Sequence, residues 1–319
     1  MIPEFRTEIR NALGKESARS LSEPDWDYET IEQIWDSFQD EASKKQYKNE
    51  FIYLALRESG IDKAEKYSPC SSKQWQSASL LAKILQNGFQ FQRLNGWQMP
   101  KLDSSTCSQE AEFYLNLTCI STFIFEQYRY GNHVCIRDKD VVLDCGACVG
   151  DSAIWALGYG ASSIHCFEPD MSNLVALKNN SARYGEGKIE IVPYAVGNEV
   201  GAVHFAHNHT KCTASKITDD TASWDQTVQM IRIDDYVKEH GIEPSFIKMD
   251  VEGGEMDALA GAKETLVRYK PQLAICLYHK PSDMWTIPEF IREILPEYRY
   301  WCRKNNPVCE FILYASAES

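Results

Sequence analysis

Two patterns of hydrophobic and polar positions follow each other along the chain. Up to about residue 130, apolar residues recur at helical spacing, and polar, turn-rich pieces separate these segments. From residue 134 onward, short β-branched runs alternate with helical patterns, which is typical of βα units and a parallel sheet. We therefore predict a helical N-terminal domain over residues 1–130 and an α/β domain over residues 131–319. The helices predicted in the first domain span residues 28–42, 44–56, 74–86 and 111–130.

Five apolar runs of the second domain predict the strands of its sheet. They span residues 141–145, 163–169, 189–196, 245–251 and 272–279. Helical patterns follow them at residues 152–157, 172–184, 234–240, 255–269 and 287–295. Two last runs, at residues 298–302 and 309–315, have only a short connection, so we expect them to pair antiparallel at the end of the sheet. Residues 201–206 and 227–233 predict an inserted hairpin or edge pair.

Composition and charge narrow the choice of partners. The formal net charge of -13 comes without clusters of Lys and Arg, which argues against a nucleic-acid partner and favours a small, neutral or weakly charged substrate. The chain has no run of eighteen apolar residues and no apolar segment at its N-terminus, so we expect no membrane span, no signal peptide and a cytoplasmic location. Its 11 cysteines are scattered through apolar segments, which indicates buried thiols rather than a disulfide framework.

The stretch VVLDCGACVGDS, residues 141–152, carries the first candidate chemistry. Cys145 and Cys148 form a CxxC pair, the pattern of a redox dithiol or of half a zinc site. However, Cys145 continues a buried-strand pattern, whereas a redox cysteine normally begins a helix, and no second such pair offers further zinc ligands. Gly146 and Gly150 instead predict a strand–loop–helix turn, in which Gly146 permits close approach of a ligand to the backbone. We therefore predict a nucleotide-binding loop whose thiols are not redox-active.

Two acidic residues indicate which nucleotide this loop binds. Glu168 ends the next predicted strand, where a carboxylate can accept hydrogen bonds from ribose hydroxyls. Asp144 lies beside a GxxxG loop, where its charge would repel a pyrophosphate and suit a cationic ligand. NAD sites usually carry GxGxxG, whereas S-adenosylmethionine has a sulfonium and an amino-acid end. The residues therefore predict S-adenosylmethionine, with an NAD-dependent enzyme as the alternative.

Five segments in this order resemble a known family. They are VVLDCGACVGDSAIWAL, IHCFEPDMSNLVALKNN, VPYAVGN, IRIDDYV and FIKMDVEGGEMDALAGAKETL. They resemble the FkbM-type S-adenosylmethionine-dependent methyltransferases. The resemblance implies a class I, Rossmann-like methyltransferase fold, with a mostly parallel seven-stranded sheet and an antiparallel final strand. It also implies methyl transfer to a hydroxyl oxygen of a sugar, polyketide or related natural product.

The same resemblance implies which residues bind the cofactor. Many family members have a Glu within the fifth strand, where this chain has Leu277, so a role for a carboxylate at that position is not carried over. The implied set is Asp144, Gly146, Ala147 and Gly150 on the methionine and ribose side, Glu168 and Pro169 at the ribose, Ala195 and Val196 near the adenine, and Asp250 at the mouth.

A hydroxyl acceptor also needs a group that takes its proton. Asp250 and His279 end adjacent predicted strands, and we choose His279 first because an unperturbed imidazole titrates near neutrality. The alternative is that His279 is only a packed or capping residue. Asp250, Glu252 and Glu255 could together bind a divalent cation such as Mg²⁺. We favour the interpretation that the two Glu residues cap the following helix, and we predict no metal site.

Three further histidines have a metal-like spacing. His204, His207 and His209 lie on the predicted hairpin, and we interpret them as part of a solvated loop.

Two hypotheses of function remain. The first is a small-molecule O-methyltransferase in which residues 1–130 build the acceptor pocket, a lid or a dimer contact. The second is a non-catalytic scaffold or regulatory protein that keeps the fold and the cofactor. The intact glycine loop and FEP segment favour the enzyme. We therefore expect a small-molecule acceptor as partner, neither nucleic acid nor membrane, and we leave a homodimer open.

Overall fold

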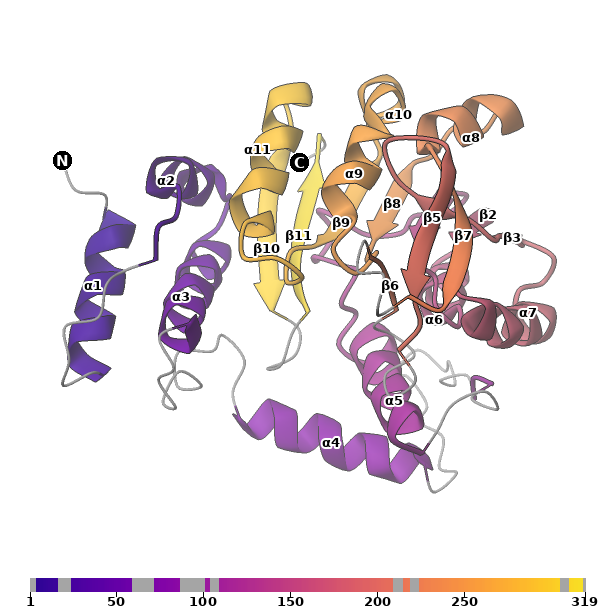
Figure 1. The fold of residues 1–319 in the computed structure, drawn as a ribbon, viewed down its shortest axis with the longest axis horizontal. Coiled ribbons are helices and arrows are strands. Elements are labelled where there is room, and N and C mark those ends of the chain that lie inside the picture. The colour runs from indigo at the N-terminus through magenta and orange to yellow at the C-terminus, as the bar shows by residue number, and fades with distance from the viewer. Residues whose placement is uncertain are drawn as a thin grey trace. The chain divides into compact units, whose positions relative to one another are not determined.

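A computed structural model gives the fold of the chain (Figure 1). It describes residues 4–16, 24–58, 72–86, 101–103, 109–208, 215–218, 224–304 and 310–317. The chain forms two compact units, one made of Met1–Ser77 with Cys276–Ser319 and the other of Ala78–Ile275. These units divide the chain differently from the boundary at residue 130, and that boundary stays a prediction.

The main sheet has seven strands in the order β10-β11-β9-β8-β1-β2-β3. Neighbours among β9, β8, β1, β2 and β3 are parallel, whereas β10 and β11 are antiparallel. This arrangement confirms the predicted fold class. The strands are β1 (Val141–Cys145), β2 (Ser163–Phe167), β3 (Ile189–Val192), β8 (Phe246–Met249), β9 (Gln272–Cys276), β10 (Arg299–Lys304) and β11 (Phe311–Ser316).

Strand β1 lies at the centre of the parallel part of the sheet. Val142 pairs with Ile164 of β2 on one side and with Phe246 of β8 on the other. All residues of β8 and β9 are buried, as expected where helices cover both faces of a parallel sheet. Because these strands run the same way, the loops that follow β1, β2 and β8 meet at one edge of the sheet.

One helix predicted in the second unit is two helices in the structure. The predicted helix over residues 255–269 is wrong as a single helix, because it breaks at Gly261. A Cβ on Gly261 would lie 1.9 Å from the carbonyl oxygen of Gly197, and the Asp234 carboxylate accepts the N–H groups of Glu264 and Thr265, which begins a new helix. The helices are α5 (Gln109–Phe123), α6 (Asp151–Leu157), α7 (Met171–Tyr184), α8 (Ile233–His240), α9 (Glu255–Ala260) and α10 (Lys263–Tyr269).

A second, four-stranded sheet lies in the same unit, in the order β4-β7-β5-β6. Its strands are β4 (Ala195–Val196), β5 (Gly201–Ala206), β6 (Lys216–Ile217) and β7 (Gln226–Ile231). Strands β5 and β7 lie side by side and antiparallel, which confirms the predicted hairpin or edge pair (Figure 1). The predicted single strand over residues 189–196 is wrong, because Pro193 has no N–H for a ladder and the chain turns there to pair β4 with β7.

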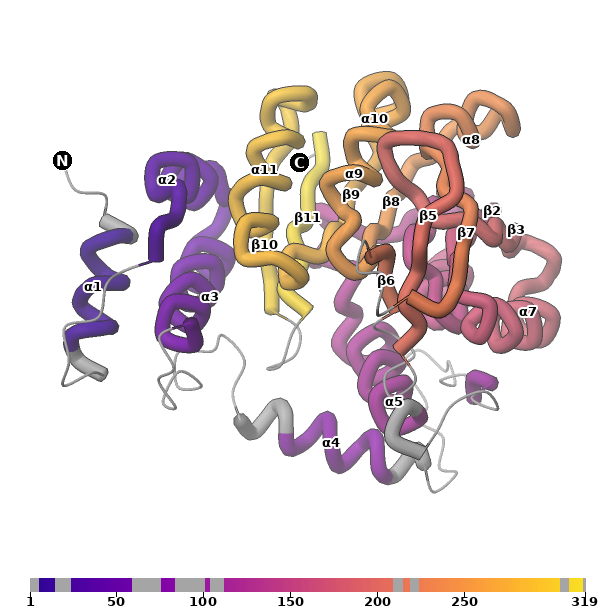
Figure 2. Tube along the Cα trace, viewed as in Figure 1, coloured from indigo at the N-terminus to yellow at the C-terminus, as the bar shows by residue number. Residues whose placement is uncertain are grey.

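The first unit contains the N-terminal helices and the C-terminal hairpin. The predicted helix over residues 28–42 ends early at Ser37, because Asp40 begins a new helix by accepting the N–H of Ser43 at 2.7 Å. Figure 2 follows the chain through this turn from α2 into α3. The helices are α1 (Glu4–Glu16), α2 (Tyr28–Ser37), α3 (Glu41–Glu58) and α11 (Asp283–Ile294), while α4 (Ser72–Gln86) begins in this unit and ends in the other. None of the helices within the described ranges is both long and apolar enough to cross a bilayer.

Helix α11 begins earlier than its predicted start at residue 287 and has Pro288 inside it. The Asp283 carboxylate accepts the N–H of Lys280 at 3.0 Å, which closes the turn before the helix. Pro288 has no N–H to bond the carbonyl of Met284, one turn earlier. The hydroxyl of Tyr47, on α3, donates to this carbonyl at 2.7 Å instead. This hydrogen bond lets the helix continue past its proline.

Candidate active site

A cavity lies at the edge of the second unit where the parallel strands end. Its wall includes Gly146 and Cys148 after β1, Glu168 and Pro169 after β2, and Asp250 after β8. Open parallel sheets bind ligands at this edge. The structure thus brings together the predicted glycine loop, the second-strand carboxylate and Asp250.

The glycine loop is shaped by contacts within the chain. Gly146 has φ +78°, and a Cβ there would lie 1.8 Å from the carbonyl oxygen of Asp250. The chain itself therefore requires a glycine here, and because Gly146 also lines the cavity, its predicted close approach to a ligand stays a prediction. Gly150 has φ +88°, and a Cβ there would lie 2.7 Å from Leu177 of α7, so the loop packs closely against that helix. Ala147 is fully buried and donates its N–H to the carbonyl of Phe167 at 3.0 Å.

Asp144 has a charge partner within the protein, which weakens the argument that its charge selects a cationic ligand, and its predicted place in the cofactor site stays a prediction. Asp144 is only 1% exposed and is not among the described residues that line the cavity. Its Oδ1 lies 3.1 Å from Lys248 Nζ, and its Oδ2 accepts a hydrogen bond from Ser152 at 2.6 Å. A buried carboxylate needs such partners because desolvation penalises its charge. Lys248 was missed, although a lysine inside the buried run FIKM is an unusual signal.

Glu168 connects two of the loops at the cavity. Its Oε2 accepts the N–H of Cys148 at 2.7 Å, and its Oε1 accepts the N–H of Asp170 at 2.8 Å. Burial raises the pKa of this carboxyl to about 8. Glu168 therefore holds a proton over much of the neutral range, and it can donate one hydrogen bond to a ligand as well as accept others.

The small sheet supplies an apolar side of the cavity. Ala195 and Val196 of β4 line the cavity, as predicted, together with Phe205 of β5 and Ile217 of β6. The last two were not predicted as site residues, because only the turn of the chain at Pro193 brings the small sheet against this edge.

His207, which directly follows β5, is largely buried, contrary to our expectation of a solvated loop. The His207 side chain is 11% exposed, and its Nδ1 lies 2.5 Å from Oδ2 of Asp170, which caps α7. His204 stacks on Trp224 with 4.3 Å between ring centroids. His209 lies outside the described residues.

The mouth of the cavity contains residues that precede β1. The hydroxyl of Tyr128 donates to Asp250 Oδ2 at 3.5 Å, and Lys248 Nζ lies 5.4 Å from the centre of the Tyr128 ring. Asp151 also lines the cavity, accepts a hydrogen bond from Thr122 Oγ1 at 2.7 Å, and has its pKa raised by burial. Tyr128 was missed because it stands in no recognisable motif, and Asp151 was not singled out although it stands in the stretch of residues 141–152.

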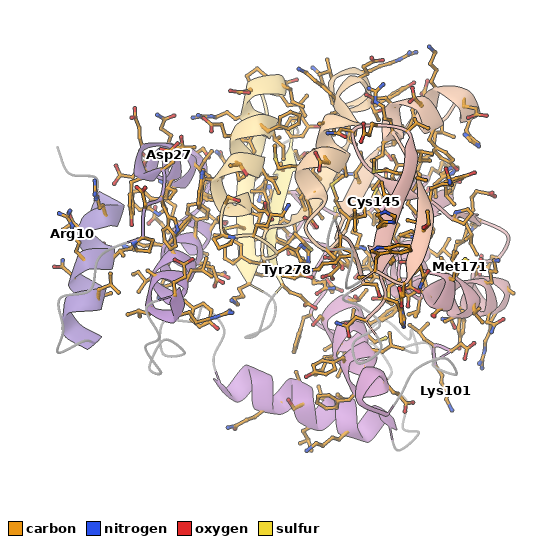
Figure 3. All side chains as sticks on the ribbon, viewed as in Figure 1. Arg10, Asp27, Lys101, Cys145, Met171 and Tyr278 are labelled. Atoms are coloured by element: carbon orange, nitrogen blue, oxygen red, sulfur yellow. The ribbon has the colours of Figure 1, made fainter. Side chains whose placement is uncertain are left out.

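Both cysteines of the CxxC pair carry thiols rather than a disulfide. Cys145 is fully buried within the strands of the second unit (Figure 3), and burial raises its pKa. A thiol in such surroundings is inert because only the thiolate is a nucleophile. Cys148 is half-buried at the cavity, where its backbone N–H holds Glu168.

The remaining predicted residues occupy different parts of the chain. Glu255, in the first turn of α9, accepts the N–H of Val251 in the preceding loop at 2.9 Å, whereas the N-cap of this helix is Gly254 without a side-chain cap. His279 follows β9 and belongs to the first unit, whereas Asp250 belongs to the second. Their predicted pairing stays a prediction, and so does the absence of a metal site.

Comparison with known proteins identifies the domain that contains this cavity. Residues 144–302 match the family model described as methyltransferase FkbM domain. The chain contains a methyltransferase domain of the FkbM family. A solved structure, the methyltransferase FkbM from Methylobacillus flagellatus KT, is 21% identical to the chain with a TM-score of 0.58. The similarity covers 90% of this chain and 58% of the Methylobacillus protein. This chain therefore spans less than two thirds of the length of that protein.

Two further solved structures are less similar to the chain. The putative methyltransferase SMU.1697c from Streptococcus mutans, in complex with SAH, is 12% identical with a TM-score of 0.36, over 57% of this chain and 90% of that one. The fibrillarin of Aeropyrum pernix, with natively bound S-adenosyl-L-methionine, is also 12% identical with a TM-score of 0.36. This similarity covers 56% of this chain and 67% of the fibrillarin chain. No curated protein matches the chain in sequence.

The FkbM domain does not supply the whole cavity. The family match begins at residue 144, so it includes Glu168, Lys248 and Asp250. Tyr128 and Thr118, which also line the cavity, precede the match. The segment before β1 is therefore part of the same site.

Proposed function

We propose that this chain transfers a methyl group from S-adenosylmethionine to a hydroxyl oxygen of a small-molecule acceptor. The observation that carries the proposal is the cavity of the FkbM domain, which joins an apolar wall at Ala195 and Val196 to the carboxyl of Glu168. An adenosine presents an apolar base next to ribose hydroxyls, and this wall matches both parts in chemistry.

The residues of the cavity fit the rest of the cofactor. Ala195, Val196, Phe205 and Ile217 would hold the adenine, and Glu168 would hold the ribose hydroxyls. Asp151 lines the cavity, and its carboxyl group suits the ammonium of an amino-acid end. Asp151 replaces Asp144 in the electrostatic argument, because Asp144 and Lys248 match each other's charge within the protein.

When bound, S-adenosylmethionine supplies an electrophilic methyl group. The protein contributes mainly by holding the acceptor oxygen in line with that group, because orientation lowers the barrier of such displacements. The acceptor proton needs a base, and His279 is our first candidate because neutral imidazole accepts protons near neutral pH. Asp250 is the second, and its carboxylate is held by the Tyr128 hydroxyl.

Calorimetric titration with S-adenosylhomocysteine and with NAD tests the cofactor. We expect binding of the first and not of the second, and Glu168→Ala should weaken binding by about 1–3 kcal/mol, the cost of unmade hydrogen bonds. Glu186→Ala, at an exposed carboxylate, is the matched control and should bind as the wild type does. NAD binding without a response to S-adenosylhomocysteine would refute the proposal.

The acceptor atom is tested with ¹³C-methyl-labelled S-adenosylmethionine and a panel of small alcohols, phenols and sugars. The chemical shift of the transferred methyl group distinguishes oxygen from nitrogen or carbon. A label found on nitrogen or carbon would leave a methyltransferase but contradict O-methylation.

A further inference from the structure

Helix α5, which precedes the FkbM domain, meets the cavity of that domain through one face. Thr118 and Thr122 stand four residues apart on α5 and therefore share this face. Thr118 lines the cavity, and Thr122 is fully buried where α5 packs against α6 (Figure 1). The Thr118 hydroxyl donates to the carbonyl of Tyr114 at 3.2 Å, whereas the Thr122 hydroxyl donates to Asp151 Oδ2 at 2.7 Å. The helix thus acts on the cavity wall through Thr122 and Asp151.

The proton of the Thr122 hydroxyl is directed toward Asp151. Gln127 is only 1% exposed, and its Nε2 donates to Thr122 Oγ1 at 3.1 Å. The backbone N–H of Gln127 donates to the carbonyl of Ser121 at 3.0 Å, which closes the turn after α5. A hydroxyl has one proton and a carboxylate only accepts, so the amide, the hydroxyl and the carboxylate form a chain with one direction. This chain fixes the orientation of the Asp151 carboxyl group at the cavity wall.

Asp151 is a buried carboxylate in a position to meet a cationic ligand. It lines the cavity and is 3% exposed, and burial raises its pKa above the ordinary value, while the hydrogen bond from Thr122 lowers this pKa in part. The Lys248 ammonium lies 3.1 Å from Asp144 Oδ1 and donates to the carbonyl of Gly146, so its charge is matched there. A cationic ligand would therefore offset the desolvation of Asp151, because an opposite charge nearby favours the ionised carboxylate.

The order of the strands gives a bound ligand its direction in the cavity. Along this part of the sheet the order is β8-β1-β2-β3, and the chain continues from β3 into β4. Ala195 and Val196 form β4, Glu168 follows β2, and Asp151 follows the glycine loop after β1. A ligand with its base at β4 and its ribose at Glu168 therefore directs its next part toward Asp151. In S-adenosylmethionine, this part carries the amino-acid end.

We propose that Thr122 is a positioning residue that holds the Asp151 carboxylate toward the ammonium of the cofactor. Through this contact the cavity selects S-adenosylmethionine over adenosines that lack an amino-acid end. The inference rests on the proposed function, because it takes the cofactor to bind in this cavity. It adds a determinant of cofactor choice that lies outside the FkbM match, which begins at residue 144.

Calorimetric titration of the full chain with two ligands tests this role. S-adenosylhomocysteine and methylthioadenosine share the adenosine and the thioether sulfur, but only the first has an amino-acid end. The wild type should bind S-adenosylhomocysteine about tenfold or more tightly than methylthioadenosine, as a charge-assisted contact allows. Thr122→Val keeps the shape of the side chain without its hydroxyl, and should weaken binding of S-adenosylhomocysteine about fivefold to tenfold. Its affinity for methylthioadenosine should stay within about twofold of the wild type, which also verifies that the variant is folded.

Three further variants serve as controls. Thr122→Ser keeps the hydroxyl and should restore the affinity for S-adenosylhomocysteine, which a role in packing alone would not explain. Thr30→Val should leave both affinities unchanged, because Thr30 is likewise buried and donates to Asp27 Oδ2 at 2.8 Å, but at the start of α2 in the first unit. If Thr122→Val does not fold, Gln127→Met decides. It removes the amide that directs the Thr122 hydroxyl, and it should weaken binding of S-adenosylhomocysteine alone, by about threefold.

The outcomes separate this inference from the proposed function. If the wild type binds S-adenosylhomocysteine no more tightly than methylthioadenosine, the inference alone is overturned. The same holds if Thr122→Val, or Gln127→Met in its place, weakens both ligands equally or neither of them, or if Thr122→Ser restores nothing. If the wild type does not bind S-adenosylhomocysteine, the proposed function fails and the inference fails with it.

Discussion

Lys248 Nζ lies 3.1 Å from Asp144 Oδ1, and the two residues stand opposite each other on the neighbouring strands β8 and β1. Both are buried, and Lys248 also donates to the carbonyl of Gly146 at 2.5 Å. The pair therefore joins the centre of the sheet to the glycine loop. It positions the loop, and it removes the free negative charge that the sequence alone assigned to this place.

Lys248→Met should destabilise the fold by about 3–5 kcal/mol, because it leaves a buried carboxylate without its partner. Urea denaturation of the variant and the wild type measures this loss. The control is Asp144→Asn with Lys248→Met, which removes the unmatched charge and should recover part of the stability. If Lys248→Met alone were as stable as the double variant, the ion pair would not be what holds the loop.

Gly146→Ala should cost more stability than Gly187→Ala. Both glycines have a positive φ, +78° and +74°, so either alanine carries the strain of a left-handed conformation, about 1–2 kcal/mol. Only at Gly146 does the added Cβ also collide with the carbonyl of Asp250, whereas nothing lies within 4 Å of a Cβ at Gly187. Unfolding free energies and titration with S-adenosylhomocysteine measure both effects. Equal losses in the two variants would contradict the close contact.

Glu168→Gln should flatten the dependence of stability on pH. The pKa of this carboxyl is about 8 in the folded chain against an ordinary value of 4.5, so the folded state binds the proton more tightly. Its contribution to stability is complete below pH 4.5 and is lost as the pH rises to about 8. Denaturant unfolding at several pH values measures the slope, with Glu186→Gln as the exposed control. An unchanged slope in the Glu168 variant would refute the raised pKa.

The CxxC pair should stay reduced in air, and Cys145 should resist iodoacetamide until the protein unfolds. Cys145 is fully buried with a raised pKa, whereas Cys148 is half-buried. Mass spectrometry of the labelled peptide, before and after denaturation, checks both statements.

Cys148→Ser should also bind S-adenosylhomocysteine as the wild type does, because Glu168 is held by the backbone N–H at position 148 and not by the thiol. Loss of that binding, or a disulfide formed in the native protein, would contradict the expectation that the pair is inert.

The class of fold and the outline of the cavity could be predicted from the amino-acid pattern. Buried strands appear as continuous apolar runs, and parallel strands must end at one edge, so the loop after β1, Glu168 and Asp250 could be placed together without coordinates. The match to the FkbM family model over residues 144–302 agrees with that outline.

The partners of the buried charges and the elements that close the site became known from the three-dimensional fold. Periodicity says that a side chain is buried, but not which atom it meets, so the partners of Asp144 and His207 could not be read from the chain. The place of β4 depended on a turn at Pro193 that sends two residues to another sheet. Tyr128 carries no motif. Its proximity to Asp250 arises from packing between segments distant in sequence, which no local pattern encodes.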